Sequence, residues 1–181
     1  ALRRECRDFL GRAVDPPARS AVESALHELS DLGAVFVPGP GSQLPADGLR
    51  ERMLPLGEVL ARMPLSPAIG RMLILGALFR CVGTACLLAA VLTSTRRPFV
   101  APPGKRRESL ACQCGFDATS DVFAAVRAAQ HYEDWRRRRG ERYADREAGE
   151  LFLVPKRLGA LLSARDGMRD ELVRAGVLAK G

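Results

Sequence analysis

The chain has 181 residues, and its 28 lysines and arginines outnumber its 21 aspartates and glutamates, which gives a formal net charge of +7. A chain of this length forms one domain, or one small domain with an appendage, and can bury a hydrophobic core. The positive charge favours polyanionic partners. The five cysteines are an odd number and no stretch resembles a signal peptide, so we expect a reduced, intracellular protein, cytoplasmic or nuclear, rather than a disulfide-bonded secreted one.

Residues 1–54 are expected to form two helices followed by two short strands. Apolar residues recur at helical spacing in the first segment, which ends at Asp15-Pro16-Pro17. A second helix is predicted from about residue 18 to residue 32, with Gly33 as its stop. Residues 34–37 suit a strand, and a return strand is predicted near residues 52–54, after a long loop rich in proline and glycine. This order is typical of the latter half of a winged helix, in which the two strands form the wing.

From Pro55 onward the sequence predicts helices to the end of the chain. Ser66 suits an N-cap and Pro67 the first helical position, so one apolar helix is predicted over about residues 67–81 and a second over 83–94. The pair contains an apolar run long enough to span a bilayer. Arg80 would then lie near the membrane centre, at a cost of roughly 2.5–3.5 kcal/mol. We therefore predict two buried helices that meet near Arg80, and no membrane segment.

The last third of the chain is predicted as a loop, a brief helix over residues 105–112 and a long helix. Ser120 is the expected cap of the long helix, and Arg136 to Arg139 lie at its C-terminal end, where the helix dipole favours cations. Acidic residues surround these four arginines, so they form either a solvated helix end with intrahelical pairs or a nuclear-import or RNA patch. Two more helical segments are expected near residues 143–153 and 155–175.

A second basic cluster brackets the loop between the apolar helices and the long helix. Arg96 and Arg97 precede the proline-rich loop, and Lys105, Arg106 and Arg107 follow it. Five cations around one turn-prone segment can engage successive phosphates of a nucleic acid. A solvated loop that binds nothing accounts for the same residues, and both interpretations stay open at this point.

No nucleotide-hydrolysing site is visible in the sequence. A Walker A loop needs a glycine five residues before its Gly-Lys pair and a serine or threonine after it, to cradle phosphates and bind magnesium. Gly104-Lys105 has Phe99 and Arg106 at those positions. The sequence also lacks an acidic motif that would hold the metal, so we predict no autonomous ATPase activity and assign no catalytic residue.

Metal ligands are not assigned either. His27 begins a pattern like that of a zinc-protease helix, but the second histidine is missing. Cys112 and Cys114 are one residue closer than the common zinc spacing. Cys81 and Cys86 fall on helices rich in alanine and leucine, so core packing is the expected role of both.

The sequence resembles the helicase-associated region of DEAH/RHA-type ATP-dependent RNA helicases. The strongest likeness lies in residues 60–67 (Leu-Ala-Arg-Met-Pro-Leu-Ser-Pro) and residues 70–77 (Gly-Arg-Met-Leu-Ile-Leu-Gly-Ala). Further support comes from Asp15-Pro16-Pro17, from the loop that runs from Arg97-Pro98-Phe99 to Gly104-Lys105, and from Ser120-Asp121. That family places a degenerate winged helix and a helical ratchet bundle after two RecA-like motor domains, where they close over the nucleic-acid strand.

The chain departs from the family pattern at several positions. Leu54 stands where the family has a threonine that caps the next helix, and Val122 stands in place of a histidine. Gln113-Cys114-Gly115 replaces a basic stretch, and Leu151 replaces an asparagine. By this resemblance the chain begins partway into the winged helix, as expected for a fragment of a larger protein or a rearranged relative.

The resemblance implies a mainly α-helical fold: a partial winged-helix domain with a short β-wing over residues 1–54, and a ratchet-like helical bundle over residues 55–181. It implies that the chain grips single-stranded RNA beside the RecA-like motor domains of the same protein. The ATP and magnesium of such a helicase would belong to those motor domains, and no cofactor is expected in this chain. The alternative is a protein-interaction module that docks helicase domains or an activator without touching RNA. The candidate RNA-binding residues are Arg96, Arg97, Lys105, Arg106, Arg107 and Arg127.

Overall fold

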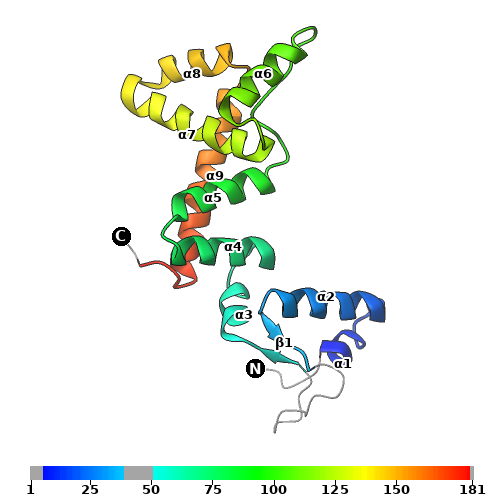
Figure 1. Cartoon of the computed structure of the whole chain (residues 1–181). Coiled ribbons are helices and arrows are strands. Elements are labelled where there is room, and N and C mark those ends of the chain that lie inside the picture. Colours follow the sequence, from blue (N-terminus) through cyan, green and yellow to red (C-terminus); the bar gives the residue numbers. More distant parts are fainter. Residues whose placement is uncertain (1–5, 39–50, 180–181) are drawn as a thin grey trace. The chain divides into compact units, whose positions relative to one another are not determined.

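The computed structural model describes residues 6–38 and 51–179 and divides the chain into two compact units, residues 1–71 and residues 72–181. Helices predominate, and the strands form a small antiparallel sheet, so the predicted mainly α-helical class with a short β-wing and a ratchet-like bundle is confirmed (Figure 1). The assignment of residues 1–54 to a partial winged helix and of residues 55–181 to a separate bundle stays a prediction.

Within residues 6–38 and 51–71, the first unit has three helices, two strands and the first turn of a fourth helix. Its elements are α1 (Cys6–Leu10), α2 (Arg19–Asp31), β1 (Val35–Phe36), β2 (Arg52–Met53) and α3 (Pro55–Leu60). The two strands pair with Val35 opposite Met53 and Phe36 opposite Arg52. Helix α2 buries Val22 and Leu26. The predicted order of two helices and two strands is therefore correct for the described residues.

The entry into α3 depends on one close approach between backbones. Leu54 is the N-cap residue and supplies no side-chain hydrogen bond, as its replacement of the family's threonine predicts. Instead, the N–H of Leu54 donates to the carbonyl of Ala34 at 2.9 Å. Gly57 then faces the same carbonyl so closely that a Cβ there would lie 2.1 Å from the oxygen. Only glycine fits at this position without a shift of the chain.

The second unit is a helical bundle whose elements pack around a pair of long helices. Helix α4 (Pro67–Leu78) crosses from the first unit into the second and is followed by α5 (Val82–Thr93), α6 (Arg106–Phe116), α7 (Asp121–Arg139), α8 (Glu141–Glu150) and α9 (Pro155–Arg174). Helix α5 packs against α9, and α7 contacts α5, α6, α8 and α9 (Figure 1). Alanines at four buried positions of α7 allow these close contacts; they are residues 124, 125, 128 and 129.

The apolar segment over residues 67–94 forms two helices, as predicted. Helix α4 ends at Leu78 and α5 begins at Val82, and Arg80 has a φ of 58°, in the left-handed region. Gly76 of α4 lies against Ala85 of α5, where a Cβ would be only 2.4 Å from the Cβ of Ala85. None of the helices over residues 6–38 and 51–179 is long and apolar enough to cross a membrane.

Two expectations for this unit need correction. Cys86 is buried, but Cys81 is exposed, because it stands at the N-cap of α5 in the turn between the helices rather than on a packed face. Helix α6 continues to Phe116 instead of ending near residue 112. Residues Gln113, Cys114 and Gly115 therefore belong to the helix. A glycine inside a helix lowers its stability but does not force the chain to turn, so Gly115 does not end α6. The predicted cap of α7 is confirmed, with the Ser120 hydroxyl accepting from the N–H of Phe123 at 3.3 Å.

A bidentate ion pair joins α7 to α9. Arg165 donates from Nη1 to Oε2 of Glu133 at 2.6 Å and from Nη2 to Oε1 at 3.0 Å. The hydrogen bonds from Arg165 lower the pKa of Glu133 below its ordinary value, although partial burial opposes the shift. The side chains of Arg165 and Glu133 are 20% and 30% exposed, so this pair is better shielded from solvent than the other ion pairs of α7.

The Glu133→Gln substitution is expected to lower the free energy of unfolding at pH 7 by about 1–2 kcal/mol, because the amide carries no negative charge and only its oxygen can accept a hydrogen bond from Arg165. The pKa of Glu133 is lower in the folded chain, so its contribution is present above the ordinary value of 4.5 and is lost as the pH falls toward the folded value. Urea unfolding between about pH 3 and pH 7 should therefore show a shallower acid loss in the variant. Asp134→Asn, on the exposed side of α7, is the matched control. If the free energy of unfolding falls with pH equally steeply in Glu133→Gln and in the unsubstituted chain, this prediction is contradicted.

Candidate nucleic-acid interface

The segment from Arg96 to Val100 is held against the end of the α8–α9 connection. Phe99 and Leu153 form an isolated antiparallel bridge. The N–H of Val100 donates to the carbonyl of Phe152 at 2.9 Å, and the N–H of Val154 donates to the carbonyl of Pro98 at 3.0 Å. Pro98 is fully buried. The loop with the predicted RNA-binding arginines is thus anchored by backbone hydrogen bonds to a segment more than 50 residues away in the sequence.

Side chains complete the anchoring of this loop. Arg157 Nη1 donates to the carbonyl of Arg97 at 2.9 Å, and the buried hydroxyl of Ser109 donates to the carbonyl of Val100 at 2.8 Å. The hydroxyl of Ser94 closes a small turn, since it accepts from the N–H of Arg96 at 3.3 Å and donates to the carbonyl of the same residue at 3.0 Å. The backbone of Arg96 and Arg97 is therefore fixed while both side chains remain exposed.

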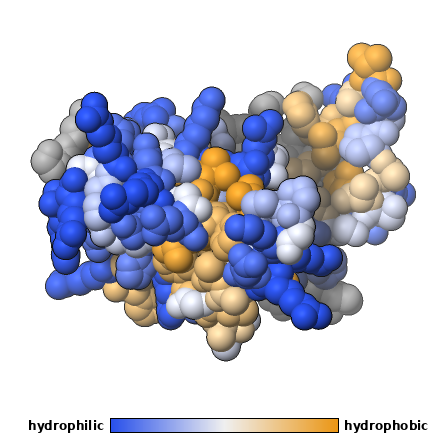
Figure 2. Space-filling model, turned by 90° about the horizontal axis from the view of Figure 1, so that it is seen from above, coloured by the Kyte–Doolittle hydropathy of each residue, from blue (hydrophilic) through white to orange (hydrophobic). Residues whose placement is uncertain are grey.

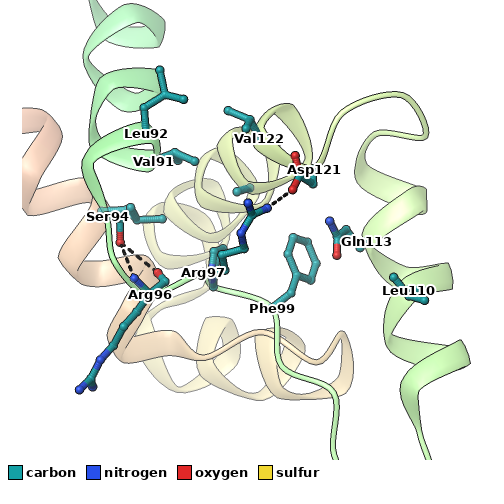
Figure 3. A pocket seen from close by; sticks show the side chains of 13 residues that line it. Val91, Leu92, Ser94, Arg96, Arg97, Phe99, Leu110, Gln113, Asp121 and Val122 are labelled. Atoms are coloured by element: carbon teal, nitrogen blue, oxygen red, sulfur yellow. Dashed lines mark hydrogen bonds and ion pairs between the residues drawn. The ribbon is translucent and has the colours of Figure 1, made fainter. Parts of the chain in front are cut away.

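A cavity of about 500 Å³ opens between this loop and the helices α5, α6 and α7. Figure 3 shows the ring of Phe99 between Arg97 and Gln113, with Val91 and Leu92 of α5 and Val122 of α7 on the opposite side. The guanidinium of Arg97 points to the carboxylate of Asp121, with which it forms an ion pair. We call this space the Phe99 cavity. Its lining residues are Val91, Leu92, Ser94, Arg96, Arg97, Pro98, Phe99, Leu110, Gln113, Asp121, Val122, Ala125 and Leu161.

Four of the six predicted RNA-binding residues are exposed cations without an ion-pair partner among the residues that the structure describes. They are Arg96, Lys105, Arg106 and Arg107. The last three stand at the N-cap and first two positions of α6. A helix dipole favours negative charge at that end, so these cations are unfavourable for the helix itself. Their charge is therefore available to an anion outside the helix.

The other two predicted residues have partners within the chain. Arg97 pairs with Asp121, but both side chains are largely exposed, and such a pair stabilises a fold by only about 0–1 kcal/mol. Arg127 donates from Nη1 to the carbonyl of Phe116 at 2.9 Å, at the end of α6, and its Nη2 lies 3.3 Å from Asp117. Hydrogen bonds from the side chain and N–H of Thr119 lower the pKa of Asp117, and Ser120 and Arg127 act in the same direction. Arg127 thus fixes the α6–α7 turn, and its role toward RNA stays a prediction.

Aromatic rings form a series that begins at Phe99 on the loop and continues along α6 and α7. Phe99 and Phe116 lie edge to face with centroids 5.8 Å apart, Phe116 and His131 are 5.6 Å apart, and His131 and Trp135 are 6.0 Å apart. Trp135 is half-buried, so it packs against the bundle without being enclosed by it. Tyr132, by contrast, is buried and donates its hydroxyl to Asp145 at 2.8 Å, and burial together with Asp145 raises its pKa to about 12.

Sequence reasoning missed two cations at the start of α9. Lys156 and Arg157 line a second cavity, of about 450 Å³, together with Arg96, Ser94, Thr95, Val154 and Ala160. We call it the Lys156 cavity. The signal in the sequence was the pair of cations immediately after Pro155, at a helix start where acidic residues are the usual choice. Only the fold brings this pair beside Arg96, which lies 60 residues earlier.

No group of three or more metal-ligating side chains occurs among residues 6–38 and 51–179. All five cysteines are free thiols, and Cys112 and Cys114 form no disulfide.

Comparison with known proteins places this fold in a family. A family model described as the ratchet-like helicase associated domain (HA2) matches residues 66–154. The ATP-dependent DNA/RNA helicase DHX36 of Homo sapiens is 35% identical over 177 residues, which are 94% of this chain and 16% of that relative. The DExH-box ATP-dependent RNA helicase DExH1 of Arabidopsis thaliana is 33% identical over 174 residues, which are 95% of this chain and 16% of that relative. The ATP-dependent RNA helicase dhx29 of Xenopus laevis is 35% identical over 170 residues, which are 92% of this chain and 11% of that relative.

The chain accordingly belongs to the helicase-associated region of DEAH/RHA-type RNA helicases, as the resemblance predicted, and residues 66–154 are its ratchet-like domain. It spans between 11% and 16% of the length of these relatives. The ratchet-like domain includes α4 to α8 and the loop with Arg96 and Arg97, so the Phe99 cavity lies almost entirely within it.

Proposed function

We propose that this chain is an RNA-contacting accessory region of a DEAH/RHA-type helicase, which grips single-stranded RNA through the backbone phosphates beside the RecA-like motor domains. The proposal is carried by the exposed cations at the start of α6, Lys105 to Arg107, whose charge the helix dipole does not favour. Arg96 adds an exposed cation on an anchored loop. By this proposal the chain itself hydrolyses no ATP, the motor domains hold ATP and magnesium, and the protein acts inside the cell.

Phosphate contacts of this kind have a measurable signature. Each phosphate that a cation neutralises releases counterions, so the logarithm of the binding constant falls linearly with the logarithm of the salt concentration, by about 0.7 per contact for single strands. Contacts to phosphates rather than to base edges are also what an unwinding enzyme needs if it is to move along many sequences.

The double substitution Lys105→Ala with Arg106→Ala is expected to weaken binding of a labelled single-stranded RNA and to reduce the salt slope by about 1.4, which corresponds to two lost phosphate contacts. Fluorescence anisotropy of the whole chain at several salt concentrations gives both quantities. Arg97 is left unchanged, because its substitution would also leave Asp121 without its partner.

The matched control is Arg142→Ala with Arg169→Ala, which removes the same charge from exposed positions on α8 and α9. It should change the affinity much less and should leave the slope nearly intact. An equal loss in both double variants would contradict a specific interface, because only the net charge would then matter.

A second candidate function is the docking of another protein domain, and exposed apolar side chains at the end of α4 favour it. Leu78 is 72% exposed, Phe79 is 77% exposed and Leu75 is 40% exposed, within five residues of one another. Large apolar side chains gathered in this way are typical of interaction surfaces. Absence of RNA binding at low salt, with the chain folded, would favour this second function over the first.

A further inference from the structure

The Phe99 cavity and the Lys156 cavity adjoin one another. Both are lined by Ser94 and Arg96, which form the small turn after α5. One cavity is mostly apolar, and the other has three cations along its walls. A ligand that fits both must carry a flat apolar body and a nearby negative charge.

The Phe99 cavity has the features of a site for a planar group. Phe99 presents its ring to the cavity, and Val91, Leu92 and Val122 form the facing wall (Figure 3). Leu92 and Leu110, which line this cavity, are each 50% exposed, so the described part of the chain leaves half of each residue uncovered. Seen from above, hydrophobic side chains gather between strongly hydrophilic areas rather than across the whole face (Figure 2). A base that stacks on an aromatic ring gains about 1–3 kcal/mol whatever its identity.

Gln113 supplies the polar edge that such a base needs. Its side chain lines the Phe99 cavity and makes no hydrogen bond with any of the described residues, although it is half-buried. A glutamine amide offers one acceptor and a pair of donors, which can serve the edge of a base with both kinds of group. The rest of the lining combines apolar side chains such as Val122 with the Arg97–Asp121 ion pair, which lies beside Phe99 (Figure 3).

The Lys156 cavity has the features of a site for a phosphate. Arg96, Lys156 and Arg157 line it together with the hydroxyl residues Ser94 and Thr95, and none of the carboxylates that the structure describes belongs to its lining. Arg157 uses Nη1 for the carbonyl of Arg97, which orients its guanidinium, while Lys156 is exposed. Three cations without a compensating acid attract an anion, and arginine and lysine are the usual phosphate ligands.

We propose that the two cavities together bind one nucleotide of a single-stranded RNA, with its base on Phe99 in the Phe99 cavity and an adjoining backbone phosphate in the Lys156 cavity. This inference rests on the proposed function and deepens it, because it adds a base subsite and two further cations to the phosphate grip at α6. The grip at Lys105 and Arg106 needs no base, whereas the subsite does. The two proposals can therefore fail separately.

The decisive experiment compares two labelled strands of equal length, an oligouridylate and the corresponding ribose-phosphate strand without bases, by anisotropy with the whole chain. The abasic strand is expected to bind at least about fivefold more weakly, because it lacks the stacked base. Equal affinities would overturn the base subsite and leave the phosphate grip standing. If neither strand binds at low salt, both proposals are wrong.

Substitutions locate the subsite. Leu92→Trp at the rim should fill the Phe99 cavity and reduce the affinity for oligouridylate to that for the abasic strand, with abasic binding unchanged. Phe123→Trp is its control, because Phe123 is 47% exposed on α7 and does not line the cavity. Thermal melting of each variant establishes that it folds. A base preference that survives Leu92→Trp would overturn the placement of the base.

The placement of the phosphate in the Lys156 cavity is tested separately, by the salt dependence of binding. Lys156→Ala should weaken binding of both strands and reduce the salt slope by about 0.7, the value for one phosphate. Lys156→Arg, which keeps the cation, should restore the slope. A salt slope that is unchanged in Lys156→Ala would overturn the placement of the phosphate.

Discussion

Substitution of Gly57 by alanine is expected to destabilise the first unit by about 3 kcal/mol or more, the upper end of the cost of overpacking. The new Cβ would lie 2.1 Å from the carbonyl oxygen of Ala34 and 3.1 Å from Cγ of Met53. The oxygen belongs to the backbone and accepts the hydrogen bond from Leu54, so it cannot move aside without loss of that bond. The entry of α3 and the pairing of β1 with β2 should both weaken.

Hydrogen exchange measured by mass spectrometry checks this result for each unit separately. Peptides that cover α2, β1 and α3 should lose protection in Gly57→Ala, while peptides from α7 and α9 should not. Gly70→Ala is the control in the same unit and should reduce protection less. Its nearest contact, at 2.6 Å, is Cδ2 of Leu60, the end of a side chain that can rotate away. If Gly57→Ala leaves the hydrogen-exchange protection of these peptides unchanged, the close contact between residue 57 and the carbonyl oxygen of Ala34 is contradicted.

Substitution of Gly76 by alanine is expected to destabilise the second unit by about 2 kcal/mol, which corresponds to a fall in Tm of roughly 5–15 °C. Its Cβ would lie 2.4 Å from the Cβ of Ala85. Neither atom can rotate out of the contact, so α4 and α5 must move apart around the tight turn at Arg80. The gain in helix propensity from glycine to alanine, about 1 kcal/mol, offsets only part of this cost.

The control in the second unit is Gly167→Ala, in the interior of α9. A Cβ at Gly167 would meet nothing within 4 Å, and the residue is exposed. Only helix propensity acts there, so this variant should be more stable by about 1 kcal/mol. Thermal unfolding followed by circular dichroism should therefore shift in opposite directions for the two variants. A shift in the same direction would contradict the packing argument for Gly76.

Several helix ends could be predicted from the sequence alone, because each is marked by residues at the helix end itself. The hydroxyl of Ser120 caps α7, and Gly140, with a φ of 87°, ends it. The break between α4 and α5 falls at Arg80, where a charged residue interrupts an apolar run. Each signal involves atoms within a few residues of one another, so its meaning does not depend on the rest of the fold.

The candidate interface was only partly predictable, and the reason is the distance along the chain between its parts. The sequence showed five cations around one loop but not their partners. Asp121, which pairs with Arg97, lies 24 residues further on, and the hydrogen bond from Arg157 to the carbonyl of Arg97 spans 60 residues. Arg127 was expected to face RNA, yet its position on α7 lets it fix the α6–α7 turn.

The sequence by itself determined the helical class, most helix ends and the family, because these depend on spacing, caps and a motif pattern carried by contiguous residues. Only the tertiary structure decided that Arg96 and Lys156 share a cavity, that Phe99 lines a pocket with Gln113, and that Cys81 is exposed while Cys86 is buried. The physical reason is that a cavity is made by side chains from several helices, and their meeting depends on the packing of the whole bundle rather than on any one segment.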